Sequence, residues 1–353
     1  MTLTILADEN IAHLDDYFGD LNLIKIKGRD ITQTAIDSHN PDALLIRSVT
    51  PINANTIKDH KNIRFVGTAT IGTDHVDTNF LNNRGICFAS AKGSSKHSVA
   101  QYVITALLTQ NPKLIHQKIT LGIIGLGNIG GTLANYAHDL AWQILGFDPY
   151  LPPSKFNNSS LDILLANSDI ISIHTPLTKT GNYPTYQLFD KTLFEKIKNH
   201  AILINTARGE IINQTALIHA IDDKNLSVIL DVFPYEPIID KSLLDKLTIA
   251  TPHIAGYTLD GKLRGTDMIY QAFCDYFNLP ILQRLDNLLP ANPYLWKDLK
   301  NELLAGNASF INNYYDIIKD DKALRDVGKT GVIGADFDRL RKDYLLKREW
   351  LYE

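Results

Sequence analysis

Arg208, Glu236 and His253 are the residues whose types and spacing most directly predict chemistry. Each follows a short apolar run, in the local sequences Thr-Ala-Arg-Gly, Tyr-Glu-Pro and Pro-His-Ile. Arginine offers a planar fork that binds a carboxylate through two hydrogen bonds. Histidine gains or loses a proton near neutral pH, and a carboxylate on its far ring nitrogen stabilises the charged ring. Together the three residues predict hydride transfer from a 2-hydroxy acid, with His253 as the base.

Each of these residues also has a purely structural interpretation. Arg208 would be an exposed turn residue, Glu236 a loop carboxylate, and His253 a core histidine with satisfied hydrogen bonds. The rival histidines for the role of base are His75, His97 and His174. His174 ends an apolar run in Ser-Ile-His-Thr-Pro, and we expect it to line the edge of a nicotinamide ring instead.

A glycine-rich turn follows the apolar run that begins at residue 119. It contains Gly125, Gly127, Asn128, Ile129 and Gly130 in the pattern G-x-G-x-x-G. The first glycine permits a tight turn, the second lets the backbone approach a pyrophosphate, and the third allows close packing of helix on strand. The helix that follows would present free N–H groups to the phosphates. The alternative is a βαβ unit whose glycine turn holds no ligand.

Asp148 ends the next apolar run, close to the expected spacing of about 20 residues past the first glycine. A carboxylate at this place accepts hydrogen bonds from the ribose hydroxyls and would repel a 2′-phosphate. The next residues are Pro149 and Tyr150, so no arginine follows to accommodate such a phosphate. The motif therefore favours NAD over NADP.

The elements that must position these residues form an α/β pattern of short apolar runs alternating with helical segments. We expect strands at 3–7, 23–26, 43–46, 64–68 and 86–88, and a second series at 119–124, 144–147, 169–174, 201–205, 228–231 and 248–250. Helices are expected at Ser95–Gln110 and Leu259–Phe277, on either side of the second series. Because the carboxyl ends of parallel strands meet at one edge, the three ionisable residues would converge there.

The predicted fold class is α/β, with two doubly wound, Rossmann-like parallel-sheet lobes joined by crossing helices. Residues 1–94 and 259–285 would form a discontinuous substrate-binding lobe, and residues 95–258 an NAD-binding Rossmann domain. The strand pattern fades after residue 286. Residues 286–353 are expected to form a small α+β module that mediates dimerisation.

At this point the chain resembles the D-isomer-specific 2-hydroxy acid dehydrogenases. The segments that carry the resemblance are Gly125–Gly130, His174–Leu177, Ile204–Gly209, Leu230–Phe233, Glu236-Pro237 and Thr251–Gly256. The resemblance implies that Arg208, Glu236 and His253 are catalytic. It implies cofactor contacts at Asp148, Thr175, Asp231 and Gly256, and substrate contacts at Ser48, Thr70 and Tyr257. The loop at 91–97 departs from the family by lacking Gly-Cys-Asn, and Gln101 replaces a usual glutamate.

Segments at both ends of the chain narrow the resemblance to members of the family that act on a phosphorylated 2-hydroxy acid. They are residues 7–10, 46–50, 65–77, 253–259 and 337–344. Arg47 is our first candidate for the phosphate contact, because Arg-Ser at a strand end suits an anion. The basic run 339–342 is either an exposed helix face or a second cation source that reaches the neighbouring subunit of a homodimer. The alternatives are a dehydrogenase of 3-phosphoglycerate, glycerate or another D-2-hydroxy acid, and an NAD-sensing regulator without turnover.

Composition limits the other partners. The 353 residues carry 35 basic and 39 acidic side chains, a net charge of −4, so no basic surface for nucleic acid is expected. Two cysteines are too few for a disulfide framework or a cysteine-based metal site, and we predict no metal. No apolar run reaches the ~18 residues that a membrane span requires, and no signal peptide is apparent. We expect a cytoplasmic protein.

Overall fold

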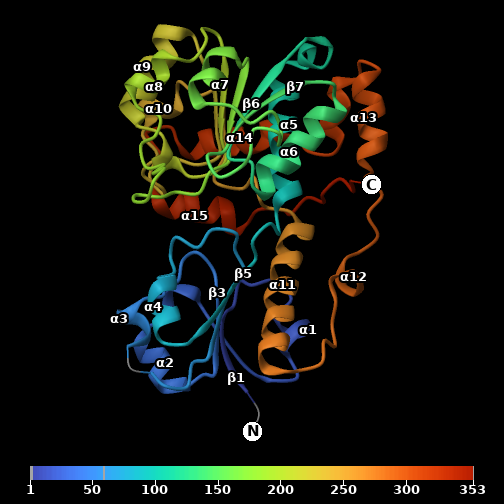
Figure 1. Ribbon diagram of the computed structural model, residues 1–353. Coiled ribbons are helices and arrows are strands. Elements are labelled where there is room, and N and C mark those ends of the chain that lie inside the picture. Colours follow the sequence, from blue (N-terminus) through green and yellow to red (C-terminus); the bar gives the residue numbers. More distant parts are fainter. Residues whose placement is uncertain (1–2, 59, 353) are drawn as a thin grey trace. The chain divides into compact units, whose positions relative to one another are not determined.

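Two series of parallel strands form two separate sheets in the computed structural model, which describes residues 3–58 and 60–352 (Figure 1). The chain divides into two compact units. Unit 1 comprises Met1–Ser95 and Thr258–Ala291, and unit 2 comprises Lys96–Tyr257 and Asn292–Glu353. Residues 286–353, which we expected as one separate module, are divided between the units: residues up to 291 belong to unit 1, and the rest belong to the same unit as the glycine-rich turn.

Unit 1 contains a five-stranded parallel sheet in the order β2-β1-β3-β4-β5. Its strands are β1 (Thr4–Asp8), β2 (Asn22–Ile26), β3 (Ala43–Ile46), β4 (Phe65–Thr68) and β5 (Cys87–Ser90). Its helices are α1 (Leu14–Phe18), α2 (Gln33–His39), α3 (Ala54–Ile57), α4 (Thr78–Asn83), α11 (Leu259–Phe277) and α12 (Leu285–Leu288).

Successive residues of β1 point to opposite faces of this sheet, and both faces are buried. Ile5 packs in a cluster with Phe18 of α1 and Phe273 of α11, whereas Leu6 packs with Ile36 of α2 on the other face. The chain therefore covers both faces with helices, as a doubly wound sheet requires.

Unit 2 contains a six-stranded parallel sheet in the order β11-β10-β9-β8-β6-β7. Its strands are β6 (Thr120–Ile124), β7 (Gln143–Phe147), β8 (Ile170–Ile173), β9 (Ile202–Asn205), β10 (Ser227–Leu230) and β11 (Ile249–Ala250). Its helices are α5 (Lys96–Gln110), α6 (Asn128–Asp139), α7 (Leu161–Asn167), α8 (Lys191–Glu195), α9 (Gln214–Lys224), α10 (Lys241–Leu244), α13 (Trp296–Leu304), α14 (Ile317–Val327) and α15 (Gly334–Lys342).

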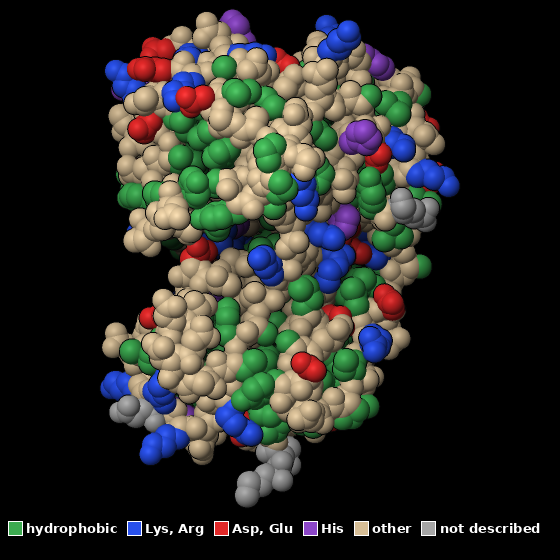
Figure 2. All heavy atoms as spheres, in the orientation of Figure 1, with side chains coloured by type: hydrophobic (Ala, Val, Ile, Leu, Met, Phe, Trp, Pro, Cys, Tyr) green, Lys and Arg blue, Asp and Glu red, His purple; other side chains and the backbone are tan. Residues whose placement is uncertain are grey.

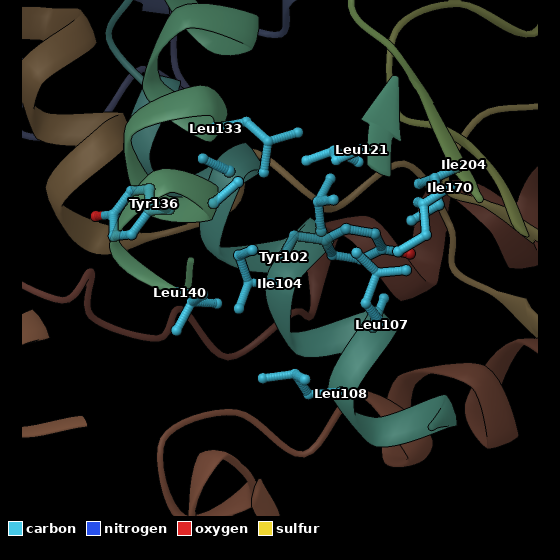
Figure 3. Packing of buried hydrophobic residues seen from close by; sticks show 14 of the residues in the cluster. Tyr102, Ile104, Leu107, Leu108, Leu121, Leu133, Tyr136, Leu140, Ile170 and Ile204 are labelled. Carbon is cyan, nitrogen blue, oxygen red and sulfur yellow. The ribbon is translucent and has the colours of Figure 1, made fainter. Parts of the chain in front are cut away.

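The core on one face of this sheet is built around α5. Figure 3 shows side chains of α5, such as Tyr102 and Leu107, lying beside Leu133 and Tyr136 of α6 and Ile170 of β8. The opposite face carries a second cluster that includes residues of α7 to α10 and of α14 and α15. Figure 2 shows hydrophobic side chains exposed across the face of unit 2 in that view, with acidic and basic side chains next to each other at its upper end.

The predicted fold class is confirmed. Every predicted strand and both predicted helices are present, with ends within two residues of the expected positions. Parallel pairing is the arrangement that near-continuous apolar runs such as Ile170–Ile173 predict, because such a strand is buried on both faces. No helix in the described part of the chain is long and apolar enough to cross a membrane.

The C-terminal segment differs from the expected α+β module. Among its described residues it forms helices and isolated β-bridges but no strand, and one bridge joins Val332 to Ile239 of the preceding part of unit 2. Ile311 and Ile317 of this segment are buried in the α5 core of the same chain. These two residues therefore need no partner subunit to cover them.

The contact between the C-terminal segment and α5 explains why residue 101 is glutamine rather than the glutamate usual in the family. Its carboxamide accepts a hydrogen bond from the Trp350 backbone N–H (2.9 Å) and donates to the Trp350 carbonyl oxygen (2.9 Å) and to the Tyr136 hydroxyl. An ionised glutamate accepts but cannot donate. Glutamine at this position thus ties the C-terminal segment to α5.

Candidate active site

The glycine-rich turn between β6 and α6 is closed on one side and open on the other. Gly125 has φ +89°, and a Cβ there would lie 2.8 Å from the His174 backbone. A Cβ on Gly130 would lie 1.9 Å from the Gly125 carbonyl oxygen, so only glycine allows α6 to begin this close to the strand. A Cβ on Gly127 would meet nothing within 4 Å. The space beside Gly127 is where a pyrophosphate would approach the backbone.

Asp148 follows β7 and lies at the same turn. Its Oδ2 accepts a hydrogen bond from the Leu126 backbone N–H (3.0 Å), and its Oδ1 accepts from Tyr150 N–H (3.1 Å). Each carboxylate oxygen can accept a second hydrogen bond. The carboxylate is therefore held in place by the turn while keeping acceptor capacity for ribose hydroxyls.

Thr175 provides an independent indication of a ligand. Its Oγ1 is buried and has no hydrogen-bond partner among the described residues. A buried hydroxyl without a partner costs about 1–3 kcal/mol, so a ligand that supplies the missing hydrogen bond would be favoured. The unpartnered hydroxyl of Thr175, the open space at Gly127 and the fixed carboxylate of Asp148 are all features that a bound dinucleotide would use. The residues present therefore fit a dinucleotide.

His253 and Glu236 form the central pair of the site. His253 Nδ1 lies 2.8 Å from Glu236 Oε2, and Glu236 Oε1 accepts a hydrogen bond from the Phe233 backbone N–H (2.8 Å). Burial opposes ionisation of Glu236, but the adjacent His253 and these hydrogen bonds outweigh it and hold the pKa of Glu236 below its ordinary value. The ionised carboxylate leaves Nε2 as the ring nitrogen of His253 that can exchange a proton with a substrate.

Asp231 holds the loop that carries His253. Its buried carboxylate accepts hydrogen bonds from the Thr251 hydroxyl (2.6 Å) and from the backbone N–H groups of Ile254 (2.8 Å) and Ala255 (2.9 Å). Burial raises the pKa of Asp231, although its donors and the nearby His253 work in the opposite direction. His253 itself adopts a left-handed backbone conformation with φ 56°, so this loop needs such support. A cofactor contact of Asp231 stays a prediction.

Arg208 lies on the loop after β9, beside the loop that carries Glu236. Its backbone carbonyl accepts a hydrogen bond from Asn205 Nδ2 (2.8 Å), and its own Nη1 donates to the Ala207 carbonyl oxygen (2.7 Å). A Cβ on Gly209 would lie 1.9 Å from the Phe233 backbone, so glycine lets the two loops touch.

The structure thus places Arg208, Glu236 and His253 after β9, β10 and β11, which are neighbours in the sheet. Their loops meet at its carboxyl edge, where open α/β sheets bind ligands.

The two rival histidines in unit 2, His174 and His97, do not suit the role of a base. Burial lowers the pKa of His174 to about 3, and its Nε2 is 2.8 Å from the Ser172 hydroxyl. His174 therefore stays neutral, with its ring nitrogens occupied by Ser172 and, at 3.4 Å, by Thr206. His97 lies 3.1 Å from the Tyr136 hydroxyl, within the contacts of α5 and α6.

The expected substrate residues of unit 1 follow β3 and β4. Arg47 and Ser48 come directly after β3, where Arg47 is half-buried and Ser48 is exposed. Thr70 Oγ1 lies 2.8 Å from Thr68 Oγ1 and donates to the Gly72 carbonyl oxygen. His75 Nε2 is 3.1 Å from Thr68 Oγ1 in the same group. These residues share the carboxyl edge of the unit 1 sheet.

The sequence analysis assigned no role to Asp8, and it placed Arg341 differently from the structure. Asp8 ends β1 and is fully buried, with an Oδ2 that has no hydrogen-bond partner among the described residues. Arg341 of α15 donates from Nη2 to the Tyr257 hydroxyl at 3.0 Å within the same chain, whereas we had considered its basic run for the neighbouring subunit. The apolar period of α15 predicts a helix, but no local signal predicts which loop that helix packs against.

Comparison with known proteins agrees with this geometry. Residues 100–255 match the family model described as "D-isomer specific 2-hydroxyacid dehydrogenase, NAD binding domain". The crystal structure of an Aquifex aeolicus D-lactate dehydrogenase with NAD and lactic acid superposes with a TM-score of 0.66 at 22% identity, covering 78% of this chain and 96% of that one. An NAD⁺-bound 3-phosphoglycerate dehydrogenase from Entamoeba histolytica gives a TM-score of 0.67 at 23% identity, covering 79% and 96%. Fold and site together define an NAD-dependent dehydrogenase of 2-hydroxy acids.

Relatives that match almost the whole chain define a narrower family than these structures do. An erythronate-4-phosphate dehydrogenase from Psychrobacter cryohalolentis is 49% identical over 380 residues, covering 99% of this chain and 97% of the relative. One from Acinetobacter baumannii is 45% identical over 354 residues, covering 99% and 98%. The chain belongs to the erythronate-4-phosphate dehydrogenase family of D-isomer-specific 2-hydroxyacid dehydrogenases.

Proposed function

We propose that this chain oxidises 4-phospho-D-erythronate at its 2-hydroxyl with NAD, giving (R)-3-hydroxy-2-oxo-4-phosphooxybutanoate and NADH, as a step in pyridoxal 5′-phosphate biosynthesis. The names of relatives that match almost the whole chain support this substrate. The single observation that carries the chemistry is the hydrogen bond between His253 and Glu236 at the carboxyl edge of the unit 2 sheet.

The chain's own residues divide the reaction between them. His253 Nε2 takes the proton of the 2-hydroxyl as the C2–H bond breaks, and Glu236 stabilises the imidazolium that forms. Arg208 binds the substrate carboxylate through its fork and so orients C2. When bound, NAD accepts the hydride from C2, so that the electron pair leaves with the hydride and a C2 carbonyl remains.

The cofactor would be held by groups already described. Gly125, Gly127, Gly130 and the N–H groups of Asn128 and Ile129 at the start of α6 would hold the pyrophosphate. The ribose would bind Asp148, and further contacts would come from Thr175, Asp231 and Gly256. The open side of the turn at Gly127 and the unpartnered hydroxyl of Thr175 support this assignment.

The proposed substrate contacts are the residues that the family resemblance implies. Ser48 and Thr70 of unit 1 and Tyr257 of unit 2 would bind the substrate, with Arg47 contacting its phosphate. On this basis residues 1–94 and 259–285 would be the substrate-binding domain, residues 95–258 the NAD-binding domain, and residues 286–353 the dimerisation region. The position of Arg47 at the carboxyl end of β3 supports its role.

We further propose that the protein is a homodimer and works in the cytoplasm. Exposed apolar side chains after residue 291 support a subunit contact: Ile318, Ile333 and Leu345 are 48%, 60% and 90% exposed. Light scattering should give twice the monomer mass at micromolar concentration, and a stable, active monomer would reject the dimer.

Turnover across a panel of D-2-hydroxy acids tests the proposed function. We expect NADH formation with 4-phospho-D-erythronate at a kcat/KM at least tenfold above that for 3-phosphoglycerate, D-glycerate or D-lactate. A preference for one of the other acids would change the substrate but keep the chemistry. NAD binding without turnover of any of them would instead identify an NAD-sensing regulator.

A further inference from the structure

Helix α15 ends in three basic residues, and only one of them contacts the candidate site. Arg339 is exposed and pairs with Asp336 of its own helix at 2.8 Å. Lys342 is exposed as well. Arg341 instead packs its guanidinium over the rings of Tyr257 and Phe337, 5.6 Å from each centroid, and donates from Nη2 to the Tyr257 hydroxyl.

Arg341 lacks the partner that a half-buried cation normally has. No carboxylate of the described residues lies within salt-bridge distance of its guanidinium, and its only hydrogen bond goes to a neutral phenol. Its Nε is buried and has no acceptor among the described residues. Because a partly desolvated guanidinium with unused donors is completed best by an anion, the missing partner is an anionic ligand.

Arg341 lies near the proposed catalytic residues, so an anion bound to it would lie near the reacting groups. Tyr257 closes the turn that follows His253, donating its backbone N–H to the Ile254 carbonyl oxygen at 2.8 Å. The positive charge of Arg341 is also one of the influences that favour ionised Glu236, after those of His253 and of the hydrogen bonds to the carboxylate. Arg341 is therefore close enough to the catalytic pair to interact with it electrostatically.

The proposed substrate carries two anionic groups, a carboxylate beside C2 and a phosphate at C4. Arg208, from the loop beside Glu236, serves the carboxylate. We propose that Arg341 binds the distal phosphate of the substrate, so that the C-terminal segment supplies a specificity-determining residue to the site of its own chain. This inference rests on the proposed function for the identity of the ligand. A guanidinium whose position is fixed by contacts with two rings presents its fork without a large further loss of side-chain freedom.

The test compares Arg341→Met with Arg339→Ala. Methionine keeps an apolar stem between Tyr257 and Phe337, which protects folding, and Arg339 is a matched arginine of the same helix without contact to Tyr257. With 4-phospho-D-erythronate we expect KM to rise ten- to a hundredfold in Arg341→Met, the usual loss for a charge-assisted hydrogen-bonding pair. With unphosphorylated D-erythronate we expect kcat/KM to change less than about threefold, and Arg339→Ala should behave as wild type with both substrates.

Two results would overturn the assignment. Equal losses with both substrates would make Arg341 a positioning residue for Tyr257 and Glu236, and no loss would remove it from the site. Arg341→Lys helps to separate a phosphate-binding role from a positioning role. Lysine keeps the charge without the fork, so this variant should retain only part of the preference for the phosphorylated substrate that Arg341→Met loses.

A binding measurement keeps this inference separate from the proposed function. Inorganic phosphate should bind the NAD-loaded protein at least tenfold more weakly in Arg341→Met than in wild type or Arg339→Ala, as measured by calorimetry. If wild type does not oxidise 4-phospho-D-erythronate, the proposed function fails while this comparison still decides the role of Arg341. Equal phosphate affinity in all three proteins, or no detectable binding to wild type, would refute it.

Discussion

The carboxyl edges of the two sheets are built differently, although both end parallel strands. In unit 2 the ionisable groups are bonded to each other or to the backbone: Glu236 holds His253, and Asp231 accepts three hydrogen bonds from the loop 251–255. In unit 1 the edge carries Arg47, which is half-buried, an exposed Ser48, and the hydroxyls of Thr68 and Thr70, which lie 2.8 Å apart. The proposed proton-transfer pair of unit 2 is thus fixed by the fold, whereas Arg47 and Ser48 leave polar groups accessible at the edge of unit 1.

The difference between the two edges follows from the requirements of proton transfer and of substrate binding. A base must keep its ring in one orientation during proton transfer, which a hydrogen bond to a fixed carboxylate achieves. Recognition of a sugar acid needs donors and acceptors that can exchange water for substrate hydroxyls. Replacing one residue at a time at each edge should therefore affect kcat at unit 2 and KM at unit 1.

The largest effect should come from His253→Ala. Loss of the base removes the group that takes the hydroxyl proton, so kcat should fall about 10²–10⁴-fold. NADH should still bind with nearly normal affinity, measured by fluorescence titration, because most of the proposed cofactor contacts lie at the glycine-rich turn after β6 and at Asp148 after β7. Near-normal turnover would give the role to a bound water, since His174 is held neutral.

Arg208→Lys should have the next largest effect. Lysine keeps a positive charge but loses the bidentate fork, so the carboxylate binds and C2 is misplaced. A misplacement of about 1 Å can cost about 10²-fold in rate, so we expect kcat/KM for the acid to fall to a similar extent. Stopped-flow measurement of the hydride step separates this loss from slower product release, and an unchanged kcat/KM would remove Arg208 from the site.

Glu236→Gln should be milder, with a fall in kcat of about tenfold. Glutamine keeps a hydrogen bond to His253 but loses the charge that stabilises the imidazolium. Because the oxidation needs the neutral ring, the acidic limb of the pH–rate profile should move to lower pH in this variant. A profile with the wild-type acidic limb would show that Glu236 does not act through His253.

The same variant has a predicted effect on stability. The pKa of Glu236 is lower in the folded protein than its ordinary value, so its ionised form stabilises the fold above that ordinary value. The stabilisation is lost as pH falls through the lowered value. Thermal unfolding should show wild type above Glu236→Gln at pH 7, with the difference disappearing in strongly acidic solution.

The sequence predicted the sheets, and the loops that carry the proposed catalytic residues, better than it predicted the C-terminal segment. The glycine-rich turn and the loops after β9, β10 and β11 lie within a few residues of the strands that place them, so local pattern was sufficient. The contact of Arg341 with Tyr257 joins residues 84 positions apart, and it depends on how α15 packs. Likewise, the apolar residues around Ile317 signalled burial but not that α5 of the same chain would cover them.

Arg47→Ala should give the smallest effect. It tests whether the carboxyl edge of the unit 1 sheet binds the substrate. Arg47 follows β3 in unit 1, where no described side-chain contact ties it to a catalytic residue, so kcat should stay within about twofold of wild type. If Arg47 contacts the phosphate, KM for 4-phospho-D-erythronate should rise about five- to tenfold, less than for a fully buried charged pair because Arg47 is half-exposed. D-erythronate, which has no phosphate, should show almost no change. Equal losses with both substrates would make Arg47 a structural residue of the sheet edge, and a fall in kcat would contradict the division of labour between the two edges.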